Sequence, residues 1–209
     1  MTSTLRLHHL AFSPNSVKVR MALGLKGIAH ELVPVDPMDR TGVLALTGQP
    51  LTPALEHGDV RLFGSGAILR YLDANFRDTG PRLFSEDRDE FRAIEEWERK
   101  TSVLGASVGA VFGQFLSGVA DAQASAAASE GIHAGTREIE ERLADSPWLV
   151  GDSPTAADLT CAAVVYLSAV PEAAAQTNPI HAFFREHLRL GEGRERTRDW
   201  VARCVAYDR

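Results

Sequence analysis

Proline is distributed so unevenly along this chain that it divides the sequence into two parts of different character. Six of the 10 prolines lie within the first 85 residues, and none occurs from Arg82 through Ser146. The first 85 residues hold 7 of the 29 alanines, whereas the remaining 124 hold 22. Because proline interrupts helix interiors and alanine favours them, the second part is predicted to be all helical.

The first part alternates between strand and helix signals. We expect strands over residues 5–10 and 29–35, a hairpin turning at His57-Gly58 between residues 53–56 and 59–63, and helices over 17–26 and 65–75. The stretch before the hairpin has no clear period. The predicted order is β-α-β-β-β-α, followed by an all-α helical-bundle domain, so the fold class is α+β with two domains. We place the domains at residues 1–79 and 86–209, joined by a linker over 80–85.

The helical part begins with one long amphipathic helix, because apolar residues recur every three or four positions from Phe91 to Phe115. Its glycines at 105, 109 and 113 are explained either by close helix packing or by a wall beside a ligand, and packing is favoured. Residues 122–129 are interpreted as a helix end or a connector. Thr155 and Asp158 are spaced as a capping box that starts a buried helix, and loss of the box should cost about 0.5–2 kcal/mol.

Charge and composition exclude several classes of function. The chain has 22 Lys and Arg against 28 Asp and Glu, a net charge of −6, which argues against nucleic acid or anionic lipid as a partner. No apolar run approaches the roughly 18 residues of a membrane span, and the N-terminus lacks a signal peptide, so we expect a cytoplasmic protein. Cys161 and Cys204 fit no metal or redox spacing, and His8 and His9 lack further ligands, so no metal site is expected.

Two short motifs place polar groups where a strand meets a helix. Ser13-Pro14-Asn15-Ser16 clusters two hydroxyls and an amide at a positive helix N-terminus, a place that can stabilise a thiolate or an oxyanion. Gly64-Ser65-Gly66 reads as an N-cap serine between glycines, whose free backbone N–H groups can hold an anion. Taken alone, each motif is more often an ordinary helix cap.

In combination the motifs carry more weight. Ser13-Pro14-Asn15-Ser16, Thr52-Pro53 before the hairpin, Gly64-Ser65 and the Thr155–Asp158 box come in one order over nearly the whole chain. This arrangement resembles the cytosolic glutathione transferase superfamily. The resemblance implies a thioredoxin-like N-terminal domain that binds glutathione as co-substrate, a second substrate held between the domains, and a homodimer.

The resemblance also assigns roles to individual residues. It implies that Ser13 stabilises the glutathione thiolate, with Asn15 assisting or substituting, and that the backbone at Thr52-Pro53, the family's cis-proline position, pairs with the cysteinyl part of glutathione. Ser65 matches the hydroxyl that binds the γ-glutamyl carboxylate, and Arg40 is the basic candidate for the glycyl carboxylate. The second-substrate pocket is expected to include Phe12, Trp97, Ser102 and Ser107.

Gly64 departs from the family pattern, because the family usually has Glu before this serine. The missing carboxylate would have taken the γ-glutamyl ammonium, and a charge-assisted hydrogen bond is worth about 1.5–3 kcal/mol. The resemblance as a whole implies an enzyme that adds the glutathione thiolate to a small apolar electrophile, or uses the thiolate to isomerise one. Two alternatives stay open: a glutathione-independent enzyme on the same fold, and a non-catalytic binding module.

Overall fold

The computed structural model describes residues 4–208, which form two compact units. Of the described residues, unit 1 comprises 4–86 and 206–208, and unit 2 comprises 87–205. The end of the chain thus belongs to the same unit as its beginning. Among the described residues, no helix is long and apolar enough to cross a membrane.

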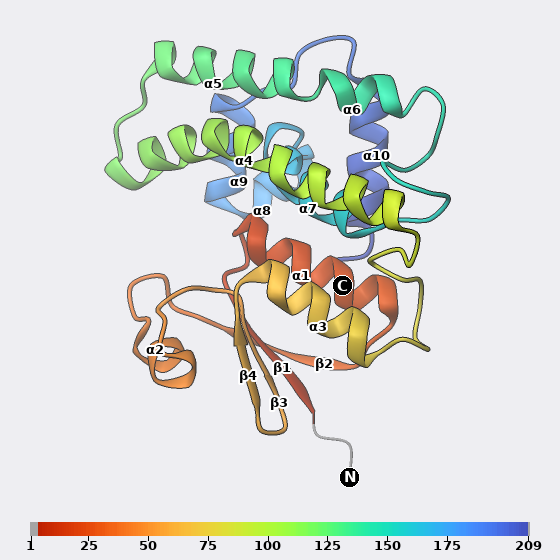
Figure 1. Ribbon diagram of the computed structural model, residues 1–209. Coiled ribbons are helices and arrows are strands. Elements are labelled where there is room, and N and C mark those ends of the chain that lie inside the picture. The colour runs from red at the N-terminus through yellow and green to blue at the C-terminus, as the bar shows by residue number, and fades with distance from the viewer. Residues whose placement is uncertain (1–3, 209) are drawn as a thin grey trace. The chain divides into compact units, whose positions relative to one another are not determined.

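Unit 1 is a mixed four-stranded sheet with two helices packed side by side over it (Figure 1). Its elements are, in chain order, β1 (Leu5–His9), α1 (Pro14–Lys26), β2 (His30–Pro34), α2 (Thr41–Thr47), β3 (Ala54–His57), β4 (Val60–Phe63) and α3 (Ser65–Asn75). The strand order is β2-β1-β3-β4; β1 and β2 are parallel, whereas β3 is antiparallel to both β1 and β4. The predicted thioredoxin-like fold is therefore confirmed, and the predicted order gains one helix, α2, between β2 and β3.

Buried and partly exposed side chains alternate along β1, so one face of the sheet packs against the core. Leu5 and Leu7 are buried to 2% and 0% exposure, while Arg6 between them reaches Glu31 and Glu56 on the neighbouring strands. Helices α1 and α3 cover the apolar side with Val19, Leu23, Ile68, Leu69 and Leu72, which are all completely buried.

Helix α2 was not expected from the sequence, which left this stretch irregular. It has seven residues, only Val43 among them is buried, and Arg40 at its N-cap gives it no side-chain cap. The helix ends at Gly48, whose φ of +73° is the left-handed conformation that glycine adopts readily. So short a helix with one buried residue has no amphipathic period to detect.

The segment after α3 packs as part of unit 1 and is held by the buried carboxylate of Asp73. Asp73 Oδ1 accepts a hydrogen bond from the Leu83 N–H at 2.7 Å, and Oδ2 accepts from Arg82 Nη2 at 2.9 Å. The completely buried Lys26 donates from Nζ to the Pro81 carbonyl at 3.0 Å and lies 3.5 Å from Asp73 Oδ1. These bonds fix residues 81–83, which lie inside the stretch expected to be a linker.

Unit 2 is helical, as predicted. Its helices are α4 (Arg88–Ser117), α5 (Ala122–Gly135), α6 (Arg137–Arg142), α7 (Ala156–Val165), the 3₁₀ turn η1 (Tyr166–Ser168), α8 (Glu172–Thr177), α9 (Pro179–His187) and α10 (Glu195–Val205). The long α4 packs along α5 and α7 (Figure 1). Residues 122–129, which we interpreted as a helix end or a connector, are the first half of α5, and Asp121 caps it by accepting from the Gln123 and Ala124 N–H groups.

Helix α7 is the buried centre of unit 2, because all ten of its residues are buried. The predicted capping box at its start is confirmed in both directions. Asp158 serves more than this box: its Oδ1 also accepts from the Leu149 N–H and from the Trp200 Nε1–H, both at 2.9 Å. One carboxylate therefore ties α7 to the loop before it and to α10.

The glycines of α4 do not pack as expected. A Cβ placed on Gly105, Gly109 or Gly113 would meet no atom of the described residues within 4 Å beyond its own helix and neighbours. Close helix packing inside unit 2, the explanation favoured from the sequence, is therefore wrong.

Candidate functional site

Ser13 lies at the N-terminus of α1, and its hydroxyl does not cap the helix. It is the N-cap residue, its carbonyl accepts the Ser16 and Val17 N–H groups at 2.9 Å, and Pro14 follows at the first helical position. Within the described residues, its side chain forms no hydrogen bond to the helix it precedes. Ser16 is buried, and its Oγ accepts from the Leu10 N–H at 3.3 Å. Of the two serines, Ser13 therefore has the hydroxyl available to a ligand.

The starts of α1 and α3 come together through one hydrogen bond. Ser65 Oγ donates to Asn15 Oδ1 at 3.1 Å across 50 residues of sequence. Ser65 is 9% exposed and is the first residue of α3. The motif predicted Ser65 as the N-cap, but the N-cap residue is Gly64. Because the first N–H groups of a helix lack partners in the helix, two positive helix ends converge at this bond.

Thr52 and Pro53 lie between α2 and β3. The peptide bond between them is cis, and Pro53 is buried while Thr52 is half-buried. Arg40 lies beside them, with its Nη1 donating to Thr52 Oγ1 at 3.4 Å and its Nε to the Pro37 carbonyl at 3.1 Å. The basic candidate for a carboxylate ligand is therefore held next to the cis peptide.

Gly64 has a backbone conformation that explains why glycine stands there. Its φ is +83° and its ψ is +117°, a region that residues with a Cβ rarely adopt. No atom of the described residues lies within 4 Å of the position a Cβ would occupy, beyond the flanking residues. The constraint on this residue is conformational, while the space beside it is open.

The residues expected in the second-substrate pocket belong to both units. Phe12 is half-buried in unit 1, in the loop before α1. On α4, Trp97 and Ser107 face the core of unit 2 at 9% and 8% exposure, whereas Ser102 is exposed and donates to the Arg99 carbonyl at 2.8 Å. Unit 2 therefore does not present Trp97, Ser102 and Ser107 on one face of α4.

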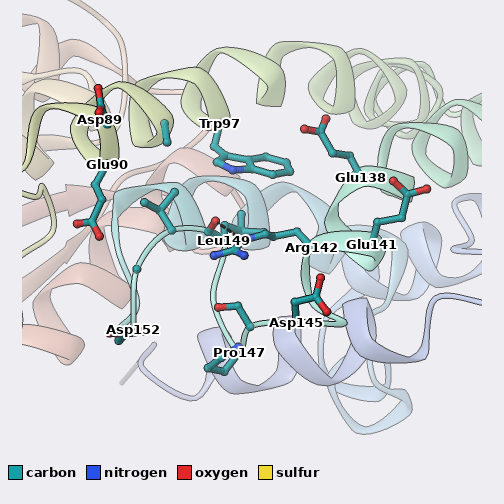
Figure 2. Close-up of a pocket in the computed structure, with 14 residues that line it drawn as sticks. Asp89, Glu90, Trp97, Glu138, Glu141, Arg142, Asp145, Pro147, Leu149 and Asp152 are labelled. Atoms are coloured by element: carbon teal, nitrogen blue, oxygen red, sulfur yellow. Dashed lines mark hydrogen bonds between the residues drawn. The ribbon is translucent and has the colours of Figure 1, made fainter.

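Trp97 does line a pocket, but one within unit 2. An open cavity of about 890 Å³ lies between α4 and the loop that carries Leu149. Figure 2 shows the indole ring of Trp97 among the residues that line it. The cavity is rimmed by carboxylates, namely Asp89, Glu90, Glu138, Glu141, Asp145 and Asp152. Over the described residues, no group of three His, Cys, Asp or Glu side chains is placed to hold a metal ion, so these carboxylates do not converge.

Comparison with known proteins gives the family. A model of the glutathione S-transferase N-terminal domain matches residues 7–81, and a model of the C-terminal domain of the same family matches residues 122–203. A glutathione S-transferase of Hyoscyamus muticus is 33% identical over 165 residues, covering 74% of this chain and 78% of that protein. Glutathione S-transferase F9 of Arabidopsis thaliana is 30% identical over 145 residues, covering 64% and 67% respectively.

Solved structures agree. Glutathione S-transferase III in its apo form superposes with a TM-score of 0.69 at 28% identity, covering 98% of this chain and 96% of that one. A glutathione S-transferase of Methylobacterium radiotolerans, in complex with glutathione sulfonate, gives 0.67 at 27% identity, covering 97% and 95%. The fold and the two helix starts define a glutathione-transferase-like protein. This chain belongs to the glutathione S-transferase family.

Proposed function

We propose that this protein is a glutathione-dependent transferase acting on a small apolar electrophile. The observation that carries the proposal is the Ser65–Asn15 hydrogen bond, because it joins the starts of α1 and α3 into one polar, electropositive surface. An anionic tripeptide with two carboxylates and a thiol suits such a surface. The relatives are named as glutathione transferases, and they supply the class of reaction.

In this proposal each residue has a defined task. Glutathione supplies the sulfur nucleophile. The Ser13 hydroxyl donates a hydrogen bond to the thiolate, and the N-terminus of α1 adds positive potential, so both lower the pKa of the thiol. Without ligand, Asn15 Oδ1 accepts the single proton of the Ser65 hydroxyl. When glutathione binds, this hydroxyl turns from Asn15 and donates to the γ-glutamyl carboxylate, which also accepts from the first N–H groups of α3. Thr52 and cis-Pro53 offer backbone groups to the cysteinyl unit, and Arg40 takes the glycyl carboxylate.

The test is a titration followed by a rate measurement. We expect heat of binding when glutathione is titrated at millimolar concentration, and conjugation of a chloronitrobenzene electrophile. Ser13→Ala should lose roughly ten- to a hundredfold in rate, as expected for a hydrogen bond to a charged group, with an unchanged unfolding midpoint. Ser117→Ala, which removes an exposed hydroxyl in unit 2, is the control and should keep full activity. Absence of binding at millimolar glutathione would refute the proposal.

Gly64 favours a second candidate, a glutathione-independent enzyme on the same fold. Glycine at this position offers no carboxylate to the γ-glutamyl ammonium, and its φ of +83° suits glycine better than a residue with a side chain. Gly64→Glu distinguishes the two. If the site binds glutathione, the new carboxylate can meet the γ-glutamyl ammonium, and the variant should bind glutathione roughly tenfold or more tightly than the wild type. If another small molecule is used, the variant should gain no affinity.

The family resemblance further supports a homodimer in the cytoplasm. Sedimentation of the purified protein tests the first property, with a mass near twice 22.7 kDa expected. A monomer with full conjugation activity would show that the dimer is not needed for this site.

A further inference from the structure

The last described residues of the chain leave α10 and dock on unit 1. Helix α10 ends at Val205, and the residues that follow belong to unit 1. Their partner there is Arg20 of α1, a cation that is only 8% exposed. No function described above uses this contact.

Arg20 joins three separate segments of unit 1. Its Nε and Nη2 donate to the two carboxylate oxygens of Asp208, each at 2.7 Å. Nη2 also donates to the Ala11 carbonyl at 3.1 Å, and Nη1 lies 3.1 Å from His9 Nδ1. The guanidinium therefore connects the chain end to the last residue of β1 and to the loop that precedes Ser13.

His9 is suited to accept the bond from Arg20. Burial, followed by the charge of Arg20, lowers its pKa from 6.5 to about 4. The ring is therefore neutral near pH 7, and its Nδ1 can act as an acceptor for the Arg20 N–H. One guanidinium therefore contacts His9, just before the loop between β1 and α1, and Ala11 within it.

Gly24 fixes the path of the chain end one turn further along α1. A Cβ on this residue would stand 1.9 Å from the Tyr207 carbonyl oxygen, far inside any permitted contact. The missing side chain therefore lets the backbone of the chain end lie directly on α1. The ion pair and this close approach are independent features that place the same segment.

We propose that Arg20 and Asp208 are positioning residues for Ser13, with the chain end acting as a clasp on the loop that carries it. This inference rests on the proposed function, in which the Ser13 hydroxyl stabilises the thiolate. Ala11 is two residues before Ser13, and the Ser13 N–H bonds to the Leu10 carbonyl at 3.2 Å. Anchoring of this loop by Arg20 therefore fixes where the Ser13 hydroxyl lies. Asp208 holds the guanidinium in the orientation that reaches Ala11.

The variants test the two features of the clasp separately: the Arg20–Asp208 ion pair and the close contact between Gly24 and Tyr207. Asp208→Asn removes the ion pair, and Asp208→Glu should rescue it. Gly24→Ala displaces the Tyr207 backbone while leaving both charges in place. The controls are Asp199→Asn, the same chemical change at an exposed position in α10, and Gly42→Ala, where a Cβ meets no described atom within 4 Å.

Two readouts apply to the full-length protein. Hydrogen exchange measures the Leu10 and Ser13 amides, and we expect it to be roughly tenfold faster in Asp208→Asn and Gly24→Ala, as for a local opening made easier by a lost ion pair. The pH dependence of kcat/KM for the electrophile, measured at saturating glutathione, reports the pKa of the bound thiol, which should rise because a mobile Ser13 stabilises the thiolate less. A purely structural role would lower the melting temperature and leave this pKa unchanged.

The outcomes separate this inference from the proposed function. If the wild type conjugates glutathione, while Asp208→Asn and Gly24→Ala leave both the exchange and the pH profile unchanged, the clasp is refuted and the function stands. If the wild type shows no conjugation, the proposed function fails and the exchange alone decides: faster exchange supports the anchoring of the loop, and unchanged exchange refutes it.

Discussion

Replacement of Asp158 by asparagine is the sharpest test of how unit 2 is held together. The carboxylate is completely buried and accepts four hydrogen bonds, two at Oδ1 from Leu149 and Trp200 and two at Oδ2 from the N–H and hydroxyl of Thr155. Burial raises the pKa of Asp158, and these four bonds favour the charged form. Asparagine keeps the shape of the side chain but replaces one acceptor oxygen with a donor.

The geometry sets the size of the effect. If the amide nitrogen takes the place of Oδ1, the buried donors of Leu149 and Trp200 both lose their acceptor. If it takes the place of Oδ2, the Thr155 hydroxyl can turn to accept, and only the Thr155 N–H is left unpaired. The second arrangement costs less, at about 1–3 kcal/mol for the buried donor, with a further loss because the remaining bonds no longer end on a charge. We therefore expect about 2–4 kcal/mol, more than the 0.5–2 kcal/mol typical of a helix cap.

The assay is urea unfolding followed by tryptophan fluorescence. All three tryptophans, Trp97, Trp148 and Trp200, lie in unit 2, so the signal reports on that unit even when the two units unfold separately. Asp152→Asn, the same chemical change at an exposed position in the loop before α7, should stay within about 0.5 kcal/mol of the wild type. A loss below about 1 kcal/mol for Asp158→Asn would refute the argument that both oxygens carry structural bonds.

Three further predictions concern stability. Gly64→Ala should destabilise unit 1 by about 1–2 kcal/mol, measured by urea unfolding followed by circular dichroism, because its φ is +83°; no loss would mean that the backbone there relaxes freely. Gly109→Ala should stabilise by about 1 kcal/mol, since no described atom meets the new methyl group, and a loss would restore the packing explanation. Burial opposes the charged form of Asp73, but bonds and charges from Arg82 and its other partners outweigh burial and lower its pKa. Its contribution to stability is therefore present above the unfolded pKa of about 3.9 and lost as pH falls below it, so Asp73→Asn should flatten the stability curve below about pH 4.

The sequence alone was sufficient for features that depend on local patterns. The proline and alanine distribution separated the sheet-containing part from the helical part, and the spacing of Thr155 and Asp158 predicted a capping box that the structure has in both directions. Helix α2 could not be predicted from the sequence, because only Val43 among its seven residues is buried and no apolar period results. The start of α5 carried a usable signal in Asp121, which we overlooked because the residues after it have no apolar period.

The candidate site was predictable only in pieces. Ser13-Pro14-Asn15 and Gly64-Ser65 could be recognised as helix starts, but the bond between Asn15 and Ser65 spans 50 residues and has no local signature. Trp97, Ser102 and Ser107 lie on one predicted helix, but the helical rotation of 100° per residue separates Ser102 from the other two. The packing of residues 206–208 on α1 has no sequence motif, because the role of Asp208 depends on its ion pair with Arg20, 188 residues away in sequence.

That the chain returns to unit 1 at residue 206 has a consequence for recombination between relatives. A chimaera with one crossover between residues 86 and 87 takes its sheet-containing unit from one parent and its chain end from the other. Arg20 and Gly24 would then receive a foreign partner, although every residue of each helix and strand is intact. A chimaera with a second crossover at residues 205–206 keeps the parental pair. The smallest exchangeable module of this protein is therefore discontinuous in sequence.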